Sequence, residues 1–298
     1  VDYQKCLPVY YYDGDAQFFV PIHLPIGDES LPINVRAKRI LEKIVAGPPV
    51  DGLMKIIPDG TKINSVKIDG DLVIVDLSKD ITSYGGGSAW ERGIVRSIVL
   101  SLTELTGIKR VQFMIDGEKR DYLPQGTIIE YPVSREGGPN TNEYLPEGKS
   151  SGYLYYLEKS GRFLVPVYWA WEGDEGDPAA KLKALYSNPT PPLSHSLMSP
   201  APNGMRIEKC EISGNELTLV LDHQDFSTAF VNISPEKFLE ATILSLYQLK
   251  PFTKIDIKIG DETSTRSIWS YSRFADLKDM AIPPNCYNEL VISLTPQI

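Results

Sequence analysis

The sequence lacks the markers of several large protein classes. It holds only three cysteines and three histidines among 298 residues, and the cysteines Cys6, Cys210 and Cys286 lie far apart. This spacing fits neither a zinc site nor a redox dithiol. An odd count cannot pair completely, so we expect three unpaired, partly buried thiols, with one bridge that includes Cys6 as the alternative. No apolar run approaches the roughly 18 residues of a membrane span.

Positive charge is also scarce. The chain has 30 Lys and Arg residues against 39 Asp and Glu residues, a formal net charge of −9. Sequence-independent binding of nucleic acid needs a basic surface that displaces counterions, so we expect no nucleic-acid partner. Attraction to anionic lipid headgroups is disfavoured for the same reason. No secretory signal peptide is recognisable, so the protein is expected to be cytosolic or to have lost a targeting segment.

Motifs of nucleotide and hydrolase sites are missing as well. Gly85–Gly87 precede a helical pattern, but Ser88-Ala89-Trp90 follows where a P-loop needs a Lys-Ser/Thr pair. No serine lies in a G-x-S-x-G turn. The histidines fall in three separate segments without ligand spacing: His23, His195 and His223.

Three acidic residues deserve comparison with catalytic or metal-binding carboxylates. Glu91 has the chemistry of a general base, and Asp76 with Asp80 has that of a carboxylate pair or a calcium site. Helix capping by Glu91 and turn capping by the aspartates explain the same residues without chemistry. We therefore predict no catalytic, cofactor-binding or metal-binding residues and no cofactor.

What the sequence does contain is an internal repeat. Five segments recur in one order with an offset of 141 to 145 residues: Phe18–Ile22 with Phe163–Val167, Leu41–Pro48 with Leu182–Pro189, Leu53–Gly60 with Leu197–Gly204, Val99–Leu102 with Ile243–Leu246, and Val111–Ile115 with Ile255–Ile259. We predict a first domain over residues 1–133, a polar Gly- and Pro-containing linker over 134–151, and a second, diverged copy over 152–298.

Each copy has the pattern β-β-α-β-β-α-β. Alternating and 3.6-residue apolar periods give strands and helices in this order. We expect an α+β fold in which two helices pack on one face of a small, mostly antiparallel sheet. Pro21 and Pro166 fall inside the second strand of each copy, which predicts an edge strand or a bulge because proline cannot donate to a ladder.

Local signals predict how the helices begin and end. In copy one, Asn34 is the expected N-cap of the first helix, and Gly47 before a proline is the expected C-cap. Ser88 and Glu91 have the spacing of a capping box at the second helix. In copy two, Ser234 before Pro235 is the expected N-cap.

Copy one resembles a known family over about residues 35–117. It reads IPDGTKINSVKIDGDLVIVDLS and then GGGSAWERGIVRSIVLSLTELTGIKRVQFMIDG. These motifs, in this order and spacing, resemble the GerM-type (GerMN) domain of sporulation and spore germination proteins. Copy two resembles it in pattern only, over about residues 182–261, without the triple glycine or the Ser-x-x-Glu segment. The duplication is similar to that of GerM-type proteins with tandem GerMN domains.

The resemblance implies a fold and a role. The fold would be similar to the ring-building motifs of the channel between mother cell and forespore. The protein would be a non-catalytic scaffold or adaptor of the spore envelope, needed for sporulation and germination, with other envelope or channel proteins as partners. It would be extracytoplasmic, at the cell membrane or between the membranes of the developing spore. It would reach the membrane only through a lipid anchor, whose cysteine this chain does not show.

An aromatic cluster in copy two is the predicted interaction surface. Two expected strands carry Tyr153, Tyr155, Tyr168, Trp169 and Trp171. Alternation places some of these rings in the core and the rest outside, where aromatics anchor interfaces or stack on sugars. The alternative function is therefore a peptidoglycan-binding module that acts in spore cortex or cell wall assembly. A cell-wall enzyme, the third alternative, needs paired carboxylates or a metal in a cleft.

Overall fold

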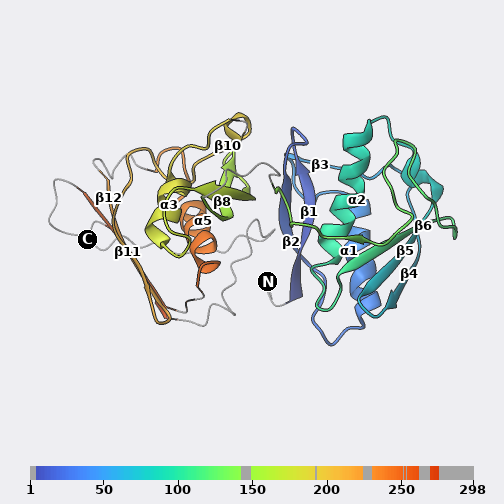
Figure 1. Cartoon of the computed structure of the whole chain (residues 1–298), viewed down its shortest axis with the longest axis horizontal. Coiled ribbons are helices and arrows are strands. Elements are labelled where there is room, and N and C mark those ends of the chain that lie inside the picture. The colour runs from blue at the N-terminus through green and yellow to red at the C-terminus, as the bar shows by residue number, and fades with distance from the viewer. Residues whose placement is uncertain are drawn as a thin grey trace. The chain divides into compact units, whose positions relative to one another are not determined.

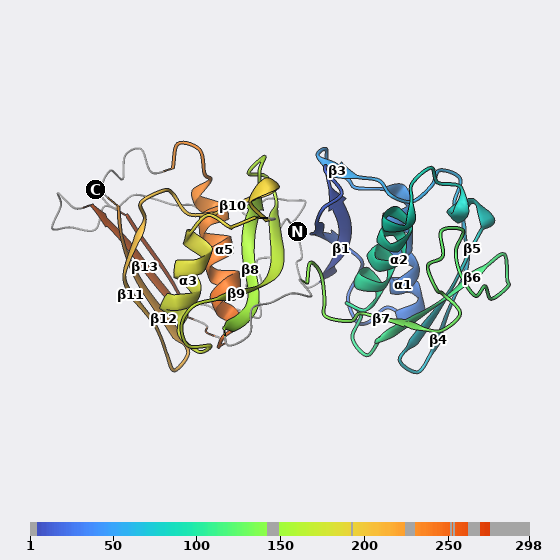
Figure 2. The same ribbon diagram turned by 45° about the horizontal axis from the view of Figure 1, so that its top comes forward.

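The computed structural model describes residues 5–141, 149–191, 193–223, 230–250, 252, 254–261 and 269–274. These residues form two compact units that divide between Pro139 and Asn140. No helix among the described residues is both long and apolar enough to cross a membrane. The two units are described separately below and can be followed by colour in Figures 1 and 2.

Unit 1 contains two small sheets and two helices. Its elements are β1 (Cys6–Asp13), β2 (Phe19–Pro25), α1 (Ile33–Ala46), β3 (Leu53–Met54), β4 (Ile63–Asp69), β5 (Leu72–Leu77), the short 3-10 helix η2 (Lys79–Thr82), α2 (Ser88–Leu102), β6 (Arg110–Ile115) and β7 (Val133–Ser134). The strand orders are β2-β1-β3 and β4-β5-β6-β7. All neighbours are antiparallel except β5 and β6.

Unit 2 repeats this plan. Its elements are β8 (Ser150–Glu158), β9 (Leu164–Trp171), α3 (Pro178–Tyr186), the short 3-10 helix η3 (Leu193–His195), β10 (Leu197–Met198), β11 (Arg206–Ser213), β12 (Glu216–His223), α5 (Pro235–Tyr247), β13 (Lys254–Asp261) and β14 (Trp269–Phe274). The strand orders are β10-β8-β9 and β11-β12-β13-β14. The parallel pair again falls in the middle, with Glu216 opposite Lys254 where unit 1 has Leu72 opposite Arg110.

In each unit the helices lie between the two sheets (Figures 1 and 2). The α+β class and the order of strands and helices are confirmed, but each unit has two sheets where we expected one. The burial of α2 gives the physical reason, because buried residues surround most of its circumference from Gly93 to Leu102. A helix that is apolar on nearly all sides needs cover on both faces, which a single sheet cannot supply.

The two prolines lie on outer strands, as predicted. Pro21 in β2 lies opposite Tyr10, and Pro166 in β9 lies opposite Tyr155. Both strands are at the edge of their sheet. Proline has no N–H, so each of these pairs exchanges no reciprocal backbone hydrogen bonds.

The helix caps were predicted with mixed success. Gly47 follows α1 with φ 91°, and Ser234 Oγ accepts a hydrogen bond from the Lys237 amide, so both are confirmed. The prediction of Asn34 as N-cap is wrong, because α1 begins at Ile33. Its N-cap residue is Pro32, whose ring fixes φ just before the first turn. The capping box at Ser88 is also wrong. No side chain caps α2, and Glu91 accepts its hydrogen bonds from elsewhere.

A serine on the second helix of each unit closes the open edge of the first strand. β3 pairs with β1 only at Tyr12 and Asp13, so the backbone of Tyr10 has no strand partner on that side. The Tyr10 amide donates to Ser101 Oγ at 3.0 Å in the buried interior. In unit 2 the Tyr155 amide donates to Ser245 Oγ at 3.1 Å. Both serines come from the repeated segments Val99–Leu102 and Ile243–Leu246.

A second contact also recurs in both units. Tyr11 Oη donates to the Lys43 carbonyl at 3.0 Å, and Tyr156 Oη donates to the Ala184 carbonyl at 3.3 Å. Each bond joins the first strand to the last turn of the first helix. Burial raises the pKa of both tyrosines, so the hydroxyls remain protonated donors. The first strand of each unit is therefore bonded to both helices.

We predict that Ser101→Ala and Ser245→Ala each lower the free energy of unfolding by about 1–3 kcal/mol, because each leaves a buried backbone N–H unsatisfied. Urea denaturation of the whole chain is the measurement. Thr106→Ala and Ser187→Ala are matched controls, since their hydroxyls make exposed hydrogen bonds. If the serine variants unfold at the same urea concentration as the controls, the edge-closing role is wrong.

Unit 2 buries a cation in its core. Lys181 on α3 is 1% exposed, and its Nζ lies 5.2 Å from the centre of the Trp171 ring. A side chain added at Gly152 would begin 3.2 Å from Trp171 Cη2 and 3.5 Å from this Nζ, so the glycine lies directly against the Trp171–Lys181 pair. In unit 1 the matching helix position is the fully buried Ile40. Burial lowers the pKa of Lys181 to about 8.

We predict that Lys181→Met raises the stability at neutral pH by about 1–4 kcal/mol, because it removes a charge from an apolar site. The unfolded lysine has a pKa of about 10.4, so between about pH 8 and pH 10 the unfolded chain binds more protons than the fold does. Stability attributable to Lys181 therefore rises over that window, and the difference between wild type and Lys181→Met should shrink. Urea denaturation at increasing pH checks this, and a constant difference contradicts it.

Candidate functional site

The carboxylates singled out in the sequence hold turns together. Asp76 Oδ1 accepts a hydrogen bond from the Gly117 amide at 2.9 Å, beyond the end of β6. Asp80 accepts one from Ser78 Oγ at 2.9 Å at the start of η2. No group of three or more potential metal ligands occurs within the part of the chain that the structure describes.

Glu91 is a buried anchor on α2. Its side chain is inaccessible to solvent. Oε1 accepts a hydrogen bond from the Thr127 amide at 2.7 Å, and Oε2 accepts one from the Gln125 amide at 2.7 Å. The Tyr84 hydroxyl donates to Oε2 as well. Burial acts to raise the pKa of Glu91, but hydrogen bonds from Thr127, Tyr84 and Gln125 outweigh it and lower the pKa. The carboxylate stays ionised because these three hydrogen-bond donors stabilise its negative charge.

Residues 118–131, here called the anchored hairpin, are the segment that Glu91 holds. The Leu123 amide donates to the Thr127 carbonyl at 2.9 Å, and Tyr122 pairs with Ile128 in an antiparallel bridge. Leu123 and Ile129 are buried. Gln112 on β6 donates through Nε2 to the Ile129 carbonyl at 2.9 Å. The hairpin is therefore fixed at its tip by Glu91 and along its base by β6.

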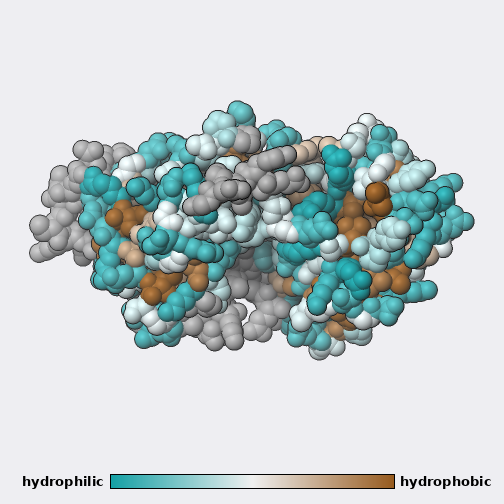
Figure 3. Space-filling view, in the orientation of Figure 1, coloured by the Kyte–Doolittle hydropathy of each residue, from teal (hydrophilic) through white to brown (hydrophobic). Residues whose placement is uncertain are grey.

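The anchored hairpin presents apolar side chains to solvent. Tyr122, Ile128 and Tyr131 are 65%, 66% and 66% exposed. Among the described residues, four large hydrophobic side chains are strongly exposed. These are three of them, and Val231 in unit 2 is the fourth. Tyr122 and Ile128 share one side of the hairpin because they are directly paired. On the face of the molecule shown in Figure 3, apolar side chains are exposed in several separate patches, with hydrophilic side chains between them.

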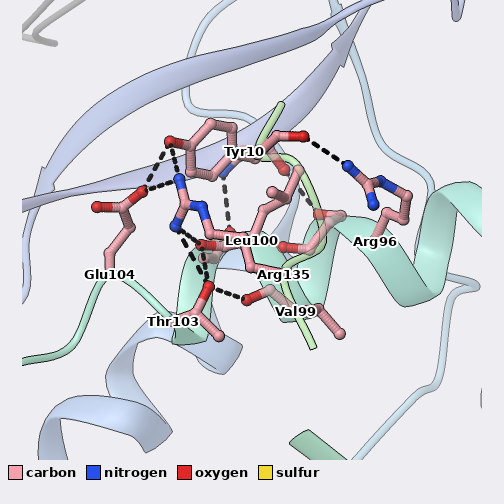
Figure 4. A network of polar contacts seen from close by, with 10 residues as sticks. Tyr10, Arg96, Val99, Leu100, Thr103, Glu104 and Arg135 are labelled. Atoms are coloured by element: carbon pink, nitrogen blue, oxygen red, sulfur yellow. Dashed lines mark hydrogen bonds and ion pairs between the residues drawn. The ribbon is translucent and has the colours of Figure 1, made fainter. Parts of the chain in front are cut away.

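Arg135 ties the segment after β7 to the end of α2 (Figure 4). Its Nη2 donates to Tyr10 Oη at 3.0 Å and pairs with Glu104, while Nη1 donates to the Leu100 carbonyl at 3.1 Å. A guanidinium at this position satisfies a terminal carbonyl and complements the negative end of the helix dipole. Arg96 Nη2 also donates to the Gly138 carbonyl at 2.7 Å.

The segment predicted as a linker is thus bonded to structure at several points. Residues 135 and 138 bond to unit 1. Asn140 Nδ2 donates to the Pro166 carbonyl at 2.8 Å, and Thr141 forms a bridge with Tyr168, both in unit 2. Residues 142–148 of the predicted linker lie outside the described residues.

The predicted aromatic surface is only partly exposed. Tyr153 and Tyr168 face each other across β8 and β9, with their ring centres 5.3 Å apart in an edge-to-face arrangement. Tyr155 and Trp169 are half-buried. Trp171 is 3% exposed and packs against Lys181, so its ring is not available to a partner. An interaction role for the other four residues stays a prediction.

The histidines and thiols lie on different elements. His23 is in β2, His195 ends η3, and His223 ends β12 with Nε2 2.9 Å from the Asn203 carbonyl oxygen. Burial, with a smaller effect of Asp177 and Glu211, raises the pKa of the Cys210 thiol to about 12, which makes it a poor nucleophile. Cys6 is buried in β1, and Cys286 lies outside the described residues.

Comparison with known proteins finds a matching family model and a related protein. Residues 8–121 match the family model Germane, described as sporulation and spore germination. A curated relative, spore germination protein GerM of Bacillus subtilis (strain 168), is 25% identical over 242 residues, which cover 76% of this chain. The chain spans 65% of the length of that relative.

A solved structure shares the fold. The tandem GerMN domains of the sporulation protein GerM from Bacillus subtilis match with a TM-score of 0.56 at 24% identity, covering 90% of this chain and 97% of that one. That likeness extends over both units, whereas the family model stops within unit 1. Residues 8–121 therefore match the Germane family of sporulation and spore germination proteins, and over both units the chain shares the fold of the tandem GerMN domains of GerM.

Proposed function

We propose that this protein is a GerM-type, non-catalytic adaptor of the spore envelope that binds a protein partner through the anchored hairpin. Its partners are other envelope or channel proteins, with the channel between mother cell and forespore as the principal candidate. It acts outside the cytoplasm, at the cell membrane or between the membranes of the developing spore, and a lipid anchor is its only link to the membrane.

The anchored hairpin is the observation that carries the proposal. Its three exposed apolar side chains, Tyr122, Ile128 and Tyr131, lie within a span of ten residues. Tyrosine is enriched among the residues that dominate binding energy at protein interfaces, because it offers a large contact area with little rotamer entropy to lose. Glu91 and Gln112 fix the hairpin backbone before any partner arrives. A surface ordered in advance avoids part of the entropy cost of association.

The state of the polar groups supports a role without catalysis. Glu91 is occupied by three donors, and its pKa is lowered, whereas a general base at neutral pH needs a raised one. Asp76 bonds the Gly117 amide. The half-buried Cys210 thiol has a raised pKa, which is the opposite of an activated nucleophile.

We predict that Tyr122→Ser combined with Ile128→Ser removes partner capture without unfolding the protein, because both side chains are exposed. Cross-linked affinity capture of the tagged full chain from sporulating cells is the measurement. Val231→Ser is the matched control, since Val231 is 71% exposed in unit 2. The control should recover the same envelope or channel proteins as wild type.

A second variant separates anchoring from contact. Glu91→Gln keeps the shape of the side chain but removes the charge that binds the hairpin amides. This variant should speed hydrogen exchange at the Gln125 and Thr127 amides and reduce capture of the partner, although Tyr122 and Ile128 themselves are not mutated. Recovery of the wild-type partners by the Tyr122→Ser, Ile128→Ser protein would show that the hairpin is not the docking surface.

A further inference from the structure

Unit 2 has an open pocket at a place that unit 1 fills with its own side chain. The pocket has a volume of about 360 Å³. Three exposed carboxamides form its rim, Asn188, Asn203 and Asn232, and Ala201 and His223 lie at its buried floor. It shares no residue with the aromatic strand pair that the sequence favoured for binding glycans.

The repeat shows how the same place is closed in unit 1. Gly47, Lys55 and Asp59 align with Asn188, Ser199 and Asn203. Lys55 lies over Gly47, where an added side chain would begin 3.0 Å from Lys55 Cδ. Lys55 Nζ then bonds Asp59 Oδ1 at 2.6 Å. The Lys55 side chain therefore lies across this corner of unit 1, and the Asp59 carboxylate that it bonds is 93% exposed.

In unit 2 the covering pair is gone. Ser199 replaces the lysine and turns into the protein, where its Oγ donates to the Leu185 carbonyl at 2.9 Å. Asn203 replaces the aspartate, and Asn188 adds a second carboxamide where unit 1 has a glycine. The exchange removes a long side chain and an ion pair together. Among the described residues that line it, the pocket that remains has no charged pair across it.

The chemistry of the pocket selects a neutral ligand with many hydrogen-bonding groups. No Asp, Glu, Lys or Arg side chain is among the described residues that line it, so a charged ligand would enter without a counter-charge. Each carboxamide offers donors and an acceptor in one plane. Met198, Ala201 and Ile233 give the lining an apolar part. The volume lies within the range of roughly 300–1,000 Å³ typical of small-ligand pockets.

A sugar with an acetamido group meets these requirements together. Its hydroxyls both donate and accept, which matches the asparagine rim. Its acetamide N–H and carbonyl oxygen point in opposite directions, so one asparagine can accept from the N–H while another donates to the carbonyl, and its methyl group fits the apolar part of the lining. We propose that the unit 2 pocket binds an N-acetylated sugar unit. This site lies in a different unit from the anchored hairpin and does not depend on the partner proposed above.

The test is a titration of the isotope-labelled full chain with N-acetylglucosamine, followed by NMR. The expected result is saturable shifts of the Asn188 and Asn232 side-chain amides, with glucose binding at least about tenfold more weakly, the order expected when hydrogen-bonding groups are left unpaired. Asn188→Ala with Asn232→Ala should weaken binding by about tenfold or more without affecting the fold, because both residues are exposed. Asn64→Ala, an exposed carboxamide in unit 1, is the matched control and should bind like wild type.

A second variant restores the arrangement of unit 1. Asn188→Gly with Ser199→Lys and Asn203→Asp rebuilds the lysine side chain and its ion pair and should abolish binding, with thermal unfolding as the check that the protein is folded. If this variant does not fold, the exposed asparagine variants still decide the matter. Absence of saturable shifts in wild type, equal binding of glucose, or unchanged binding by the Asn188→Ala, Asn232→Ala protein would each overturn the proposal.

Discussion

The unpaired edge of the first strand is the constraint on which each unit depends. A proline lies opposite Tyr10 and another opposite Tyr155, so the backbone polar groups of both tyrosines point away from the hairpin partner. Buried backbone groups must find partners, and the short third strand reaches only two residues further along. A serine on the second helix supplies the missing acceptor in both units. In unit 1, Ser97 also donates to the Tyr10 carbonyl at 2.6 Å.

This bond explains the layered architecture. A helix that must lie against the edge of the first strand is held next to the small sheet, and its opposite side is then covered by the four-stranded sheet. The carbonyl end of α2 consequently lies beside β1, where Arg135 bonds both Tyr10 and Leu100. Glu91, near the other end of α2, holds the anchored hairpin. One helix therefore fixes the small sheet, the segment after β7 and the candidate docking surface.

The sequence was sufficient for features that depend on local pattern. Apolar periodicity located the strands and helices, the repeat gave the duplication, and the proline pair gave the edge strands. Features that depend on distant partners were not accessible. Glu91 has the spacing of a capping box, yet two of its three donors lie 34 and 36 residues further on, and the third is Tyr84. Trp171 fits the pattern of an exposed aromatic, but a buried lysine from α3 packs against it.

The same reasoning explains why the anchored hairpin was missed. Its apolar residues occur as adjacent pairs without a clear period, and only the burial of Leu123 and Ile129 shows which side faces out. The signal that was available is the polar and Gly-Pro-containing tip between two apolar pairs, Tyr122-Leu123 and Ile128-Ile129. The single sheet was expected because strand pairing cannot be read from periodicity alone.

The two copies keep one framework and differ in what they present around it. Unit 1 has the Glu91-held hairpin, whereas the position that aligns with Glu91 in unit 2 is Pro235, which has no side-chain acceptor. Unit 2 instead opens a pocket where unit 1 has the Lys55–Asp59 pair. Differences at these positions leave the serine-to-strand bond intact. We expect the two copies to have different tasks.

Amide hydrogen exchange at Tyr10 and Tyr155 tests the central claim most directly. If helix serines close the strand edges, both amides exchange only when their unit unfolds, with protection equal to that of core strand amides such as Val73 and Leu219. Exchange of either amide at the rate of an exposed sheet edge, while the core amides stay protected, would contradict the account.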